Sequence, residues 1–311
     1  MTPWDRRTGS TSDLLDAEVL ARLNTIRIDT RRRSSNALMG HHASVNHGVS
    51  IEFAEHKEYS PGDDPRHIDW RAAGRQDRLY VKRFEDETNL KCFLLVDTSG
   101  SMGYGSEART KLEYAAQIAG AIAFVLLQQT DSVGLLGFHS EVGPYVPPRS
   151  RSDHLQVLAS ALLDLQPSGT TSIEGALEHV LERTSGRSLV VVLSDFFDAS
   201  PRFGRIVRQV AKHHEIALLH VLDPAEQSFP FDQVTLFQAM EGPEEVLAEP
   251  RVIRATYLRE MNQFRERVRR DALQAGADYC LLSTDVPIDA AIRTWRAGES
   301  AGREGGTSRA I

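Results

Sequence analysis

The sequence predicts an α/β protein built on a doubly wound, mostly parallel sheet, with a smaller β-rich extension on its N-terminal side. Two observations lead to this prediction. From residue 90 onward, short and nearly continuous apolar runs alternate with longer amphipathic segments. That alternation is typical of strands buried between two layers of helices. Several of the apolar runs end in small polar or acidic residues, at the sheet edge where such folds bind ligands.

The first 89 residues divide into two expected segments. Residues 1–34 are expected to form an N-terminal helical segment, because apolar residues recur at helical spacing across residues 12–30. Residues 35–89 are expected to be β-rich, with strands at Val49–Phe53 and Leu79–Phe84 on either side of a turn-rich stretch that contains Pro and Gly.

Residues 90–297 are expected to form the α/β domain, and the Gly- and Ser-rich residues 298–311 a disordered tail. Apolar runs predict strands at 90–97, 132–138, 187–196, 215–223, 234–240 and 278–284, with an edge arm at 141–147 where proline is tolerated. Amphipathic spacing predicts helices at 109–130, 153–165, 172–184, 202–213, 254–274 and 287–296.

The composition of the 311-residue chain disfavours several classes of protein. No run approaches the ~18 consecutive apolar residues of a membrane span, and the first residues lack the charged-then-apolar pattern of a secretory signal. Two cysteines cannot build a disulfide framework or a four-thiolate zinc site. The net charge of −7 disfavours nucleic acid as a partner. We therefore expect a cytoplasmic protein with no integral membrane span and no nucleic-acid ligand.

Polar side chains follow two of the predicted strands and fill one loop between them. Asp97, Ser99 and Ser101 leave the first strand at alternating positions, which point the same way on an extended segment. Asp195 follows the strand at 187–196, and the loop at 168–173 is rich in Ser, Gly and Thr. Because the carboxyl ends of parallel strands meet at one edge of a sheet, these groups are expected to converge.

Carboxylate and hydroxyl oxygens are ligands for a hard divalent cation, Mg²⁺ first, or else Mn²⁺ or Ca²⁺. With few charged ligands the ion stays electrophilic, so that an open position accepts a carboxylate from a partner. Each group alone also fits a structural role: the serines cap a helix, and Thr170 or Thr171 caps the next one. Their joint placement at several strand ends favours the cation site.

Three motifs resemble the metal-ion-dependent adhesion site of the von Willebrand factor type A domain. They are Asp-Thr-Ser-Gly-Ser-Met at 97–102, Gly-Thr-Thr-Ser-Ile-Glu-Gly-Ala-Leu at 169–177 and Leu-Ser-Asp-Phe at 193–196. The resemblance implies a von Willebrand factor A-like fold, direct metal bonds from the two serines and often the threonine, and aspartates that act largely through water. Carried over by position, the implied metal site consists of Asp97, Ser99, Ser101, Thr171 and Asp195.

The segment before the α/β domain resembles the signature of the bacterial domain-of-unknown-function 58 family. Pro-Gly-Asp-Asp-Pro-Arg-His-Ile-Asp-Trp stands at 61–70 and Val-Lys-Arg-Phe-Glu-Asp-Glu at 81–87. The family's genes commonly neighbour those of MoxR-type AAA+ ATPases. The resemblance therefore implies a non-enzymatic, metal-dependent protein-binding module, an adaptor that works with such an ATPase in assembling or activating protein complexes. The chain itself has no phosphate-binding loop of the Gly-x-x-x-x-Gly-Lys-Ser/Thr type.

Three alternatives remain at this stage. A Mg²⁺-dependent phosphotransferase or hydrolase would use Asp97 as nucleophile; such enzymes commonly carry an acidic residue two positions later, where this chain has Ser99, and Lys111 is a possible neutralising group. A purely structural scaffold would leave the metal loop empty. The five histidines between 41 and 67 suggest a transition-metal site, although they lack tight ligand spacing.

Overall fold

The computed structural model describes residues 10–28, 52–58, 80–85, 90–140, 142–151, 153–184 and 186–304. The chain forms two compact units. One consists of residues 1–34 together with residues 90–311, and the other of residues 35–89. The signature at 61–70 and the histidine side chains between 41 and 67 lie outside what is described.

The described part of residues 35–89 is an antiparallel strand pair. Strand β1 (Glu52–Glu58) pairs with β2 (Tyr80–Glu85), and the register shifts between Phe53 and Glu55. Strand β2 lies where the sequence predicts a strand. The predicted strand at Val49–Phe53 ends too early, because β1 follows its pairing with β2 to Glu58 through residues of little apolar character; residues 49–51 lie outside the described residues.

The second unit contains a six-stranded sheet in the order β10-β7-β6-β3-β4-β5. All neighbouring pairs are parallel except β4 and β5, so β5 is an antiparallel edge strand. The predicted doubly wound, mostly parallel sheet is confirmed. Its strands are β3 (Lys91–Asp97), β4 (Ser132–Phe138), β5 (Val142–Arg149), β6 (Leu189–Ser194), β7 (Glu215–Leu222) and β10 (Asp278–Ser283).

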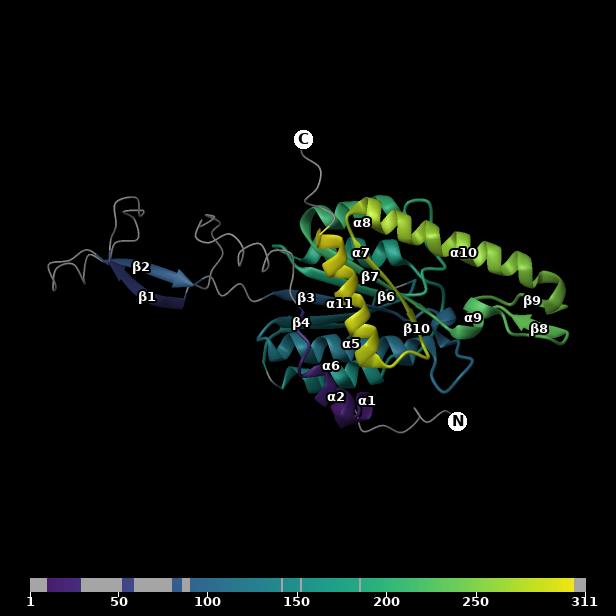
Figure 1. Cartoon of the computed structure of the whole chain (residues 1–311), viewed down its shortest axis with the longest axis horizontal. Coiled ribbons are helices and arrows are strands. Elements are labelled where there is room, and N and C mark those ends of the chain that lie inside the picture. The colour runs from purple at the N-terminus through teal and green to yellow at the C-terminus, as the bar shows by residue number, and fades with distance from the viewer. Residues whose placement is uncertain are drawn as a thin grey trace. The chain divides into compact units, whose positions relative to one another are not determined.

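Helices cover both faces of this sheet (Figure 1). On one face lie α5 (Lys111–Gln128), α6 (His154–Leu163) and α11 (Ile288–Glu304). On the other lie α7 (Ile173–Arg183), α8 (Phe203–His213) and α10 (Pro250–Ala275). Within the described residues, no helix is both long and apolar enough to cross a bilayer.

The side chains of the central strand β3 alternate between the two apolar layers of the core. Leu94 and Val96 pack beneath α5, whereas Phe93 and Leu95 pack beneath α7 and α8. Burial on both faces explains why this strand reads as a continuous apolar run rather than an alternating one. A strand held on both faces by packed helices is a rigid support for the residues that follow its carboxyl end.

The N-terminal residues form two short helices rather than the single helix predicted over 12–30. Helix α1 (Thr11–Leu14) ends before Asp16. Asp16 is the N-cap residue of α2 (Ala17–Leu23). Both helices belong to the same compact unit as the α/β domain. Leu14 and Leu15 are buried against Gly120 of α5, where a Cβ would come within 2.5 Å of the Leu14 Cδ2 atom.

Two further predictions are corrected. The run at 234–240 does not add a strand to the main sheet. Instead, β8 (Thr235–Gln238) pairs with β9 (Glu245–Ala248) in a separate antiparallel hairpin, which follows the short helix α9 (Pro224–Ser228). Alternate residues of β8 are exposed, so it could not be buried between two helix layers.

The predicted disordered tail begins too early. Helix α11 continues through residues 298–304, beyond the expected end of the helix at 296. The helix extends past the Gly and Ser residues that suggested disorder, because its first turns are already anchored by the buried side chains of Ile292 and Trp295. A helix that has nucleated adds further residues at little cost.

Candidate cation site

The strand order of the main sheet reverses between β3 and β6. From β3 the chain moves to β4 and β5 on one side and then returns to β6 on the other. Asp97 is the last residue of β3, and Ser194 and Asp195 stand at the end of β6. In doubly wound sheets the crevice at such a reversal is where ligands bind. The fold therefore brings the predicted acidic residues to the expected place.

Backbone hydrogen bonds tie the loop after β3 to the loop before α7. The amide of Gly100 donates to the carbonyl of Gly169 at 2.9 Å, and the amide of Ser168 donates to the carbonyl of Thr98 at 2.7 Å. Gly169 has a φ of +65°, a left-handed conformation that glycine adopts without strain. These bonds hold two segments that are 70 residues apart in register with one another.

A cluster of hydroxyl groups surrounds the carboxylate of Asp97. Thr171 Oγ1 donates to both of its oxygens at 3.1 and 3.2 Å, and Ser194 Oγ donates to Oδ2 at 2.6 Å. The backbone amide of Ser99 donates to Oδ1 at 2.9 Å. Ser99 and Ser101 lie side by side, with their Oγ atoms 3.1 Å apart. Four of the five predicted ligands therefore form one connected group.

Asp97 is a buried carboxylate without a cationic partner. Its side chain is fully buried, and no basic side chain of the described residues forms an ion pair with it. Burial, with a further contribution from the negative charge of Asp195, raises the pKa of Asp97 to about 7 even though its hydrogen bonds oppose the rise. An ionised carboxylate in this position lacks a compensating charge.

Asp195, the fifth predicted ligand, is engaged by a lysine. Lys111 Nζ lies 2.7 Å from Asp195 Oδ2 and 2.7 Å from Glu226 Oε1, and the lysine side chain is fully buried. Burial alone would lower the lysine pKa, but the two carboxylates outweigh it and raise that pKa, which keeps the ammonium charged. Asp195 Oδ1 accepts a hydrogen bond from the amide of Phe197 at 3.2 Å.

The donor set fits a divalent cation. Asp97, Asp195 and Glu226 bring three negative charges near one ammonium, that of Lys111, which leaves a formal charge of −2. Among the described residues no group of three or more His, Cys, Asp or Glu side chains is placed to hold a metal. Hydroxyl oxygens would therefore have to supply much of the coordination, and oxygen-only sets suit Mg²⁺, Mn²⁺ or Ca²⁺.

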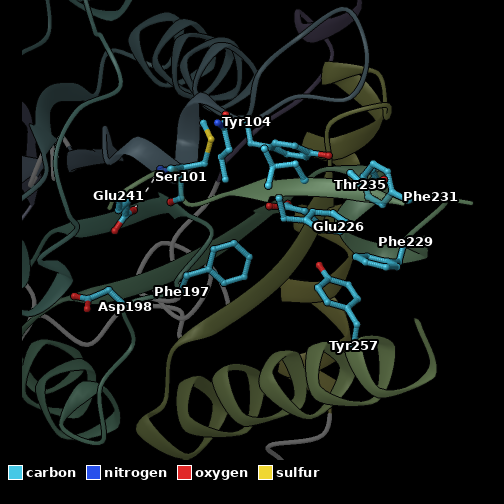
Figure 2. A pocket seen from close by; sticks show the side chains of 15 residues that line it. Ser101, Tyr104, Phe197, Asp198, Glu226, Phe229, Phe231, Thr235, Glu241 and Tyr257 are labelled. Carbon is cyan, nitrogen blue, oxygen red and sulfur yellow. Dashed lines mark hydrogen bonds between the residues drawn. The ribbon is translucent and has the colours of Figure 1, made fainter. Parts of the chain in front are cut away.

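A cavity of about 610 Å³ opens beside Ser101. Figure 2 shows Ser101 and Glu241 at one side of it, and Phe229, Phe231 and Tyr257 at the other. The ring of Phe229 lies 4.3 Å from that of Tyr257 and 5.2 Å from that of Phe231, measured between centroids. The cavity beside the candidate site therefore has hydroxyl and carboxyl groups on one side and aromatic rings on the other.

The structure also places three further residues at the site: Glu226 and Glu241, which the sequence analysis did not name, and Lys111, which it named only for the enzyme alternative. Lys111 is recognisable in retrospect as a lone cation at the start of a long apolar helix. Glu226 completes a capping box with Asp223, the start signal of α9. Glu241 comes from a hairpin tip and carries no local signal. Of the two threonines in this loop, Thr171, which the resemblance implied, contacts Asp97, whereas Thr170 is exposed.

His220 of β7 lies behind the site and makes stability depend on pH. It is fully buried, its Nδ1 lies 2.9 Å from Tyr279 Oη, and the ring of Phe196 packs against it. Burial lowers the pKa of His220 to about 3, so the unfolded chain takes up this proton first as the pH falls below about 6.5.

The contribution of His220 to stability is therefore complete above pH 6.5 and is lost as the pH falls toward 3. We expect the wild type to lose about 2 kcal/mol more than His220→Leu between pH 7 and pH 5. Urea unfolding at the two pH values measures this difference. Equal losses in both proteins would show that His220 is not the group responsible.

Comparison with known proteins places the chain in a family. The model of the family "Protein of unknown function DUF58" matches residues 55–267. The chain belongs to the DUF58 family. The matched range runs from the strand pair at 52–85 into α10, so it includes every residue of the candidate cation site.

This DUF58 protein has similar relatives in mycobacteria. Uncharacterized protein Rv1480 of Mycobacterium tuberculosis and uncharacterized protein Mb1516 of Mycobacterium bovis are each 26% identical to it over 278 residues, which cover 88% of this chain and 87% of the relative. The match therefore spans most of both chains.

Among solved structures, the chain is similar to the conserved hypothetical protein BatB from Bacteroides thetaiotaomicron, with 15% identity, a TM-score of 0.45, and coverage of 68% of this chain and 99% of BatB. It is also similar to the SpRpn10 VWA domain, with 11% identity, a TM-score of 0.36, and coverage of 65% and 92%. The strand order of this chain by itself shows a doubly wound, mostly parallel sheet with an antiparallel edge strand.

Proposed function

We propose that this DUF58 protein is a non-enzymatic, cytoplasmic adaptor that binds an acidic side chain of a partner protein through a divalent cation. The observation that carries the proposal is the state of Asp97, a buried carboxylate surrounded by hydroxyl groups and without a basic partner. Mg²⁺ held by Ser99, Ser101 and Thr171, with Asp97 and Asp195 behind them, would supply the missing positive charge and an electrophilic position for a carboxylate.

Exposed apolar side chains near the site support a protein as the partner. Within the described residues, eleven large apolar side chains are exposed, and seven of them lie in the 20-residue stretch that holds the β8–β9 hairpin and the start of α10. Such concentrations are typical of protein-binding surfaces. The seven are Val234, Leu236, Met240, Val246, Leu247, Val252 and Ile253.

The environment of Asp97 favours binding over phosphoryl transfer. A nucleophilic carboxylate has to face the phosphoryl group that it attacks. Both oxygens of Asp97 instead accept hydrogen bonds from within the protein, and the side chain is fully buried. Lys111, the possible neutralising group of the enzyme alternative, is held by Asp195 and Glu226. These contacts support a role in binding rather than catalysis.

The partner that we propose is a MoxR-type AAA+ ATPase. Purified tagged wild type should retain a purified MoxR-type ATPase from the same organism in Mg²⁺ and release it in excess chelator. Asp97→Ala should lose the ATPase in both conditions while keeping its circular dichroism spectrum. Retention that is unchanged in chelator would contradict metal dependence, and Mg²⁺-dependent hydrolysis of p-nitrophenyl phosphate that Asp97→Asn abolishes would favour the enzyme alternative.

A further inference from the structure

The tip of the β8–β9 hairpin lies against the loop that carries the candidate metal ligands. The backbone amide of Ser101 donates to Glu241 Oε1 at 3.3 Å, and Figure 2 shows the two residues facing each other across the edge of the cavity. Glu241 lies in the turn between β8 and β9, 140 residues from Ser101 in the sequence. A carboxylate of the chain itself therefore lies at the mouth of the cation site.

The backbone of the hairpin also contacts this loop closely. A Cβ placed on Gly100 would lie 2.3 Å from the carbonyl oxygen of Met240 and 3.3 Å from Glu241 Cγ. Only glycine at this position allows the hairpin to approach so far. The hydrogen bond and the backbone contact are separate observations, and both place residues 240–241 directly over the Ser99–Ser101 turn.

The charges around Glu241 are unfavourable without a cation. No basic side chain of the described residues forms an ion pair with Glu241. Burial raises the pKa of the nearby Asp198, and the negative charges of Glu174 and Glu241 raise it further. A hairpin that brings another carboxylate close to Asp198 adds repulsion between like charges, which a positive ion between them would relieve.

We propose that Glu241 is an internal ligand of the cation site, which takes the position that a partner's acidic side chain occupies in the complex. This inference rests on the proposed function. The hairpin then acts as a competitor, and binding of a partner requires the Glu241 carboxylate to leave. The exposed apolar residues of β8 and β9 move with Glu241, so that the partner contact and the release of the hairpin are coupled.

The experiment compares Glu241→Gln with Glu244→Gln, which removes the same charge three residues away on the same hairpin. The probes are Mn²⁺ alone, measured by titration calorimetry and by its electron paramagnetic resonance signal, and the peptide acetyl-Gly-Asp-Gly-amide added at saturating Mn²⁺. Glu241→Gln should weaken Mn²⁺ binding by on the order of tenfold, because affinity follows the charge of the ligands. It should tighten peptide binding by a similar factor, because the internal competitor is gone.

The opposite signs of the two changes distinguish an internal ligand from a residue that merely supports the loop, since damage to the loop would weaken both. Glu244→Gln should leave both affinities within about twofold of the wild type. Equal Mn²⁺ affinities for wild type, Glu241→Gln and Glu244→Gln would overturn the inference, as would an unchanged peptide affinity.

Asp97→Asn separates this inference from the proposed function. If wild type binds Mn²⁺ and Asp97→Asn does not, the result supports the cation site, whatever Mn²⁺ affinity Glu241→Gln has. If wild type and Asp97→Asn bind Mn²⁺ equally weakly, both the cation site and the role of Glu241 are overturned.

Discussion

Replacing Lys111 with methionine is expected to cost about 3–5 kcal/mol of folding free energy. The lysine side chain is fully buried, and its ammonium lies 2.7 Å from both Asp195 and Glu226. Methionine fills a similar volume but leaves both carboxylates without a counter-charge, in a region where Asp97 already lacks one. Urea unfolding in excess chelator measures the loss.

Two variants control this experiment. Adding Glu226→Gln to Lys111→Met should recover part of the lost stability, because one uncompensated charge is removed while an oxygen remains to accept from the Asp223 amide. Lys212→Met changes an exposed lysine on α8 and should alter stability by less than about 0.5 kcal/mol. A loss of less than about 1 kcal/mol for Lys111→Met would show that Lys111 does not balance the two acids.

Replacing Asp97 with asparagine is expected to have opposite effects with and without metal. In excess chelator at pH 7 the variant should be more stable than wild type, by on the order of 2–4 kcal/mol, because it no longer buries a charge whose pKa is raised to about 7. Asparagine keeps the shape of the side chain and can still bond to Ser99, Thr171 and Ser194. The midpoint of urea unfolding measures the change.

With Mg²⁺ at a hundredfold its dissociation constant, wild type should gain about 2.7 kcal/mol and Asp97→Asn should gain nothing. Asp164→Asn, which changes an exposed carboxylate after α6, should respond to Mg²⁺ as wild type does. If Mg²⁺ stabilises Asp97→Asn and wild type equally, the ion binds elsewhere.

The main sheet and the ends of its strands could be predicted from the sequence because each depends on local pattern. Strand β3 is a run of apolar residues because both of its faces are covered. Asp97 marks its end because a carboxylate is costly inside a strand that is packed on both faces. The convergence of Asp97, Ser99, Ser101 and Thr171 then follows from the general rule for parallel sheets.

The parts that could not be predicted depend on contacts between distant segments. The role of Lys111 depends on Asp195, 84 residues away, and Glu226, 115 residues away, and neither distance leaves a periodic signal. The sequence predicts a strand of the main sheet at 234–240 because the four residues of β8 have the composition of a strand. The turn that follows β8 decides which strand it pairs with, and that strand is β9. The end of β1 at Glu58 likewise depends on its pairing with β2.

The α/β unit is discontinuous, since residues 35–89 are inserted between α2 and β3. Arg22 of α2 forms an ion pair with Asp289 of α11, and α1 lies against α5 and α6. During synthesis the ribosome therefore releases the first piece of this unit long before its last helix exists. The N-terminal helices have to wait for α5 and α6 before Leu14 and Leu15 are covered, and for α11 before Arg22 can pair with Asp289. Until then those leucines are available to chaperones.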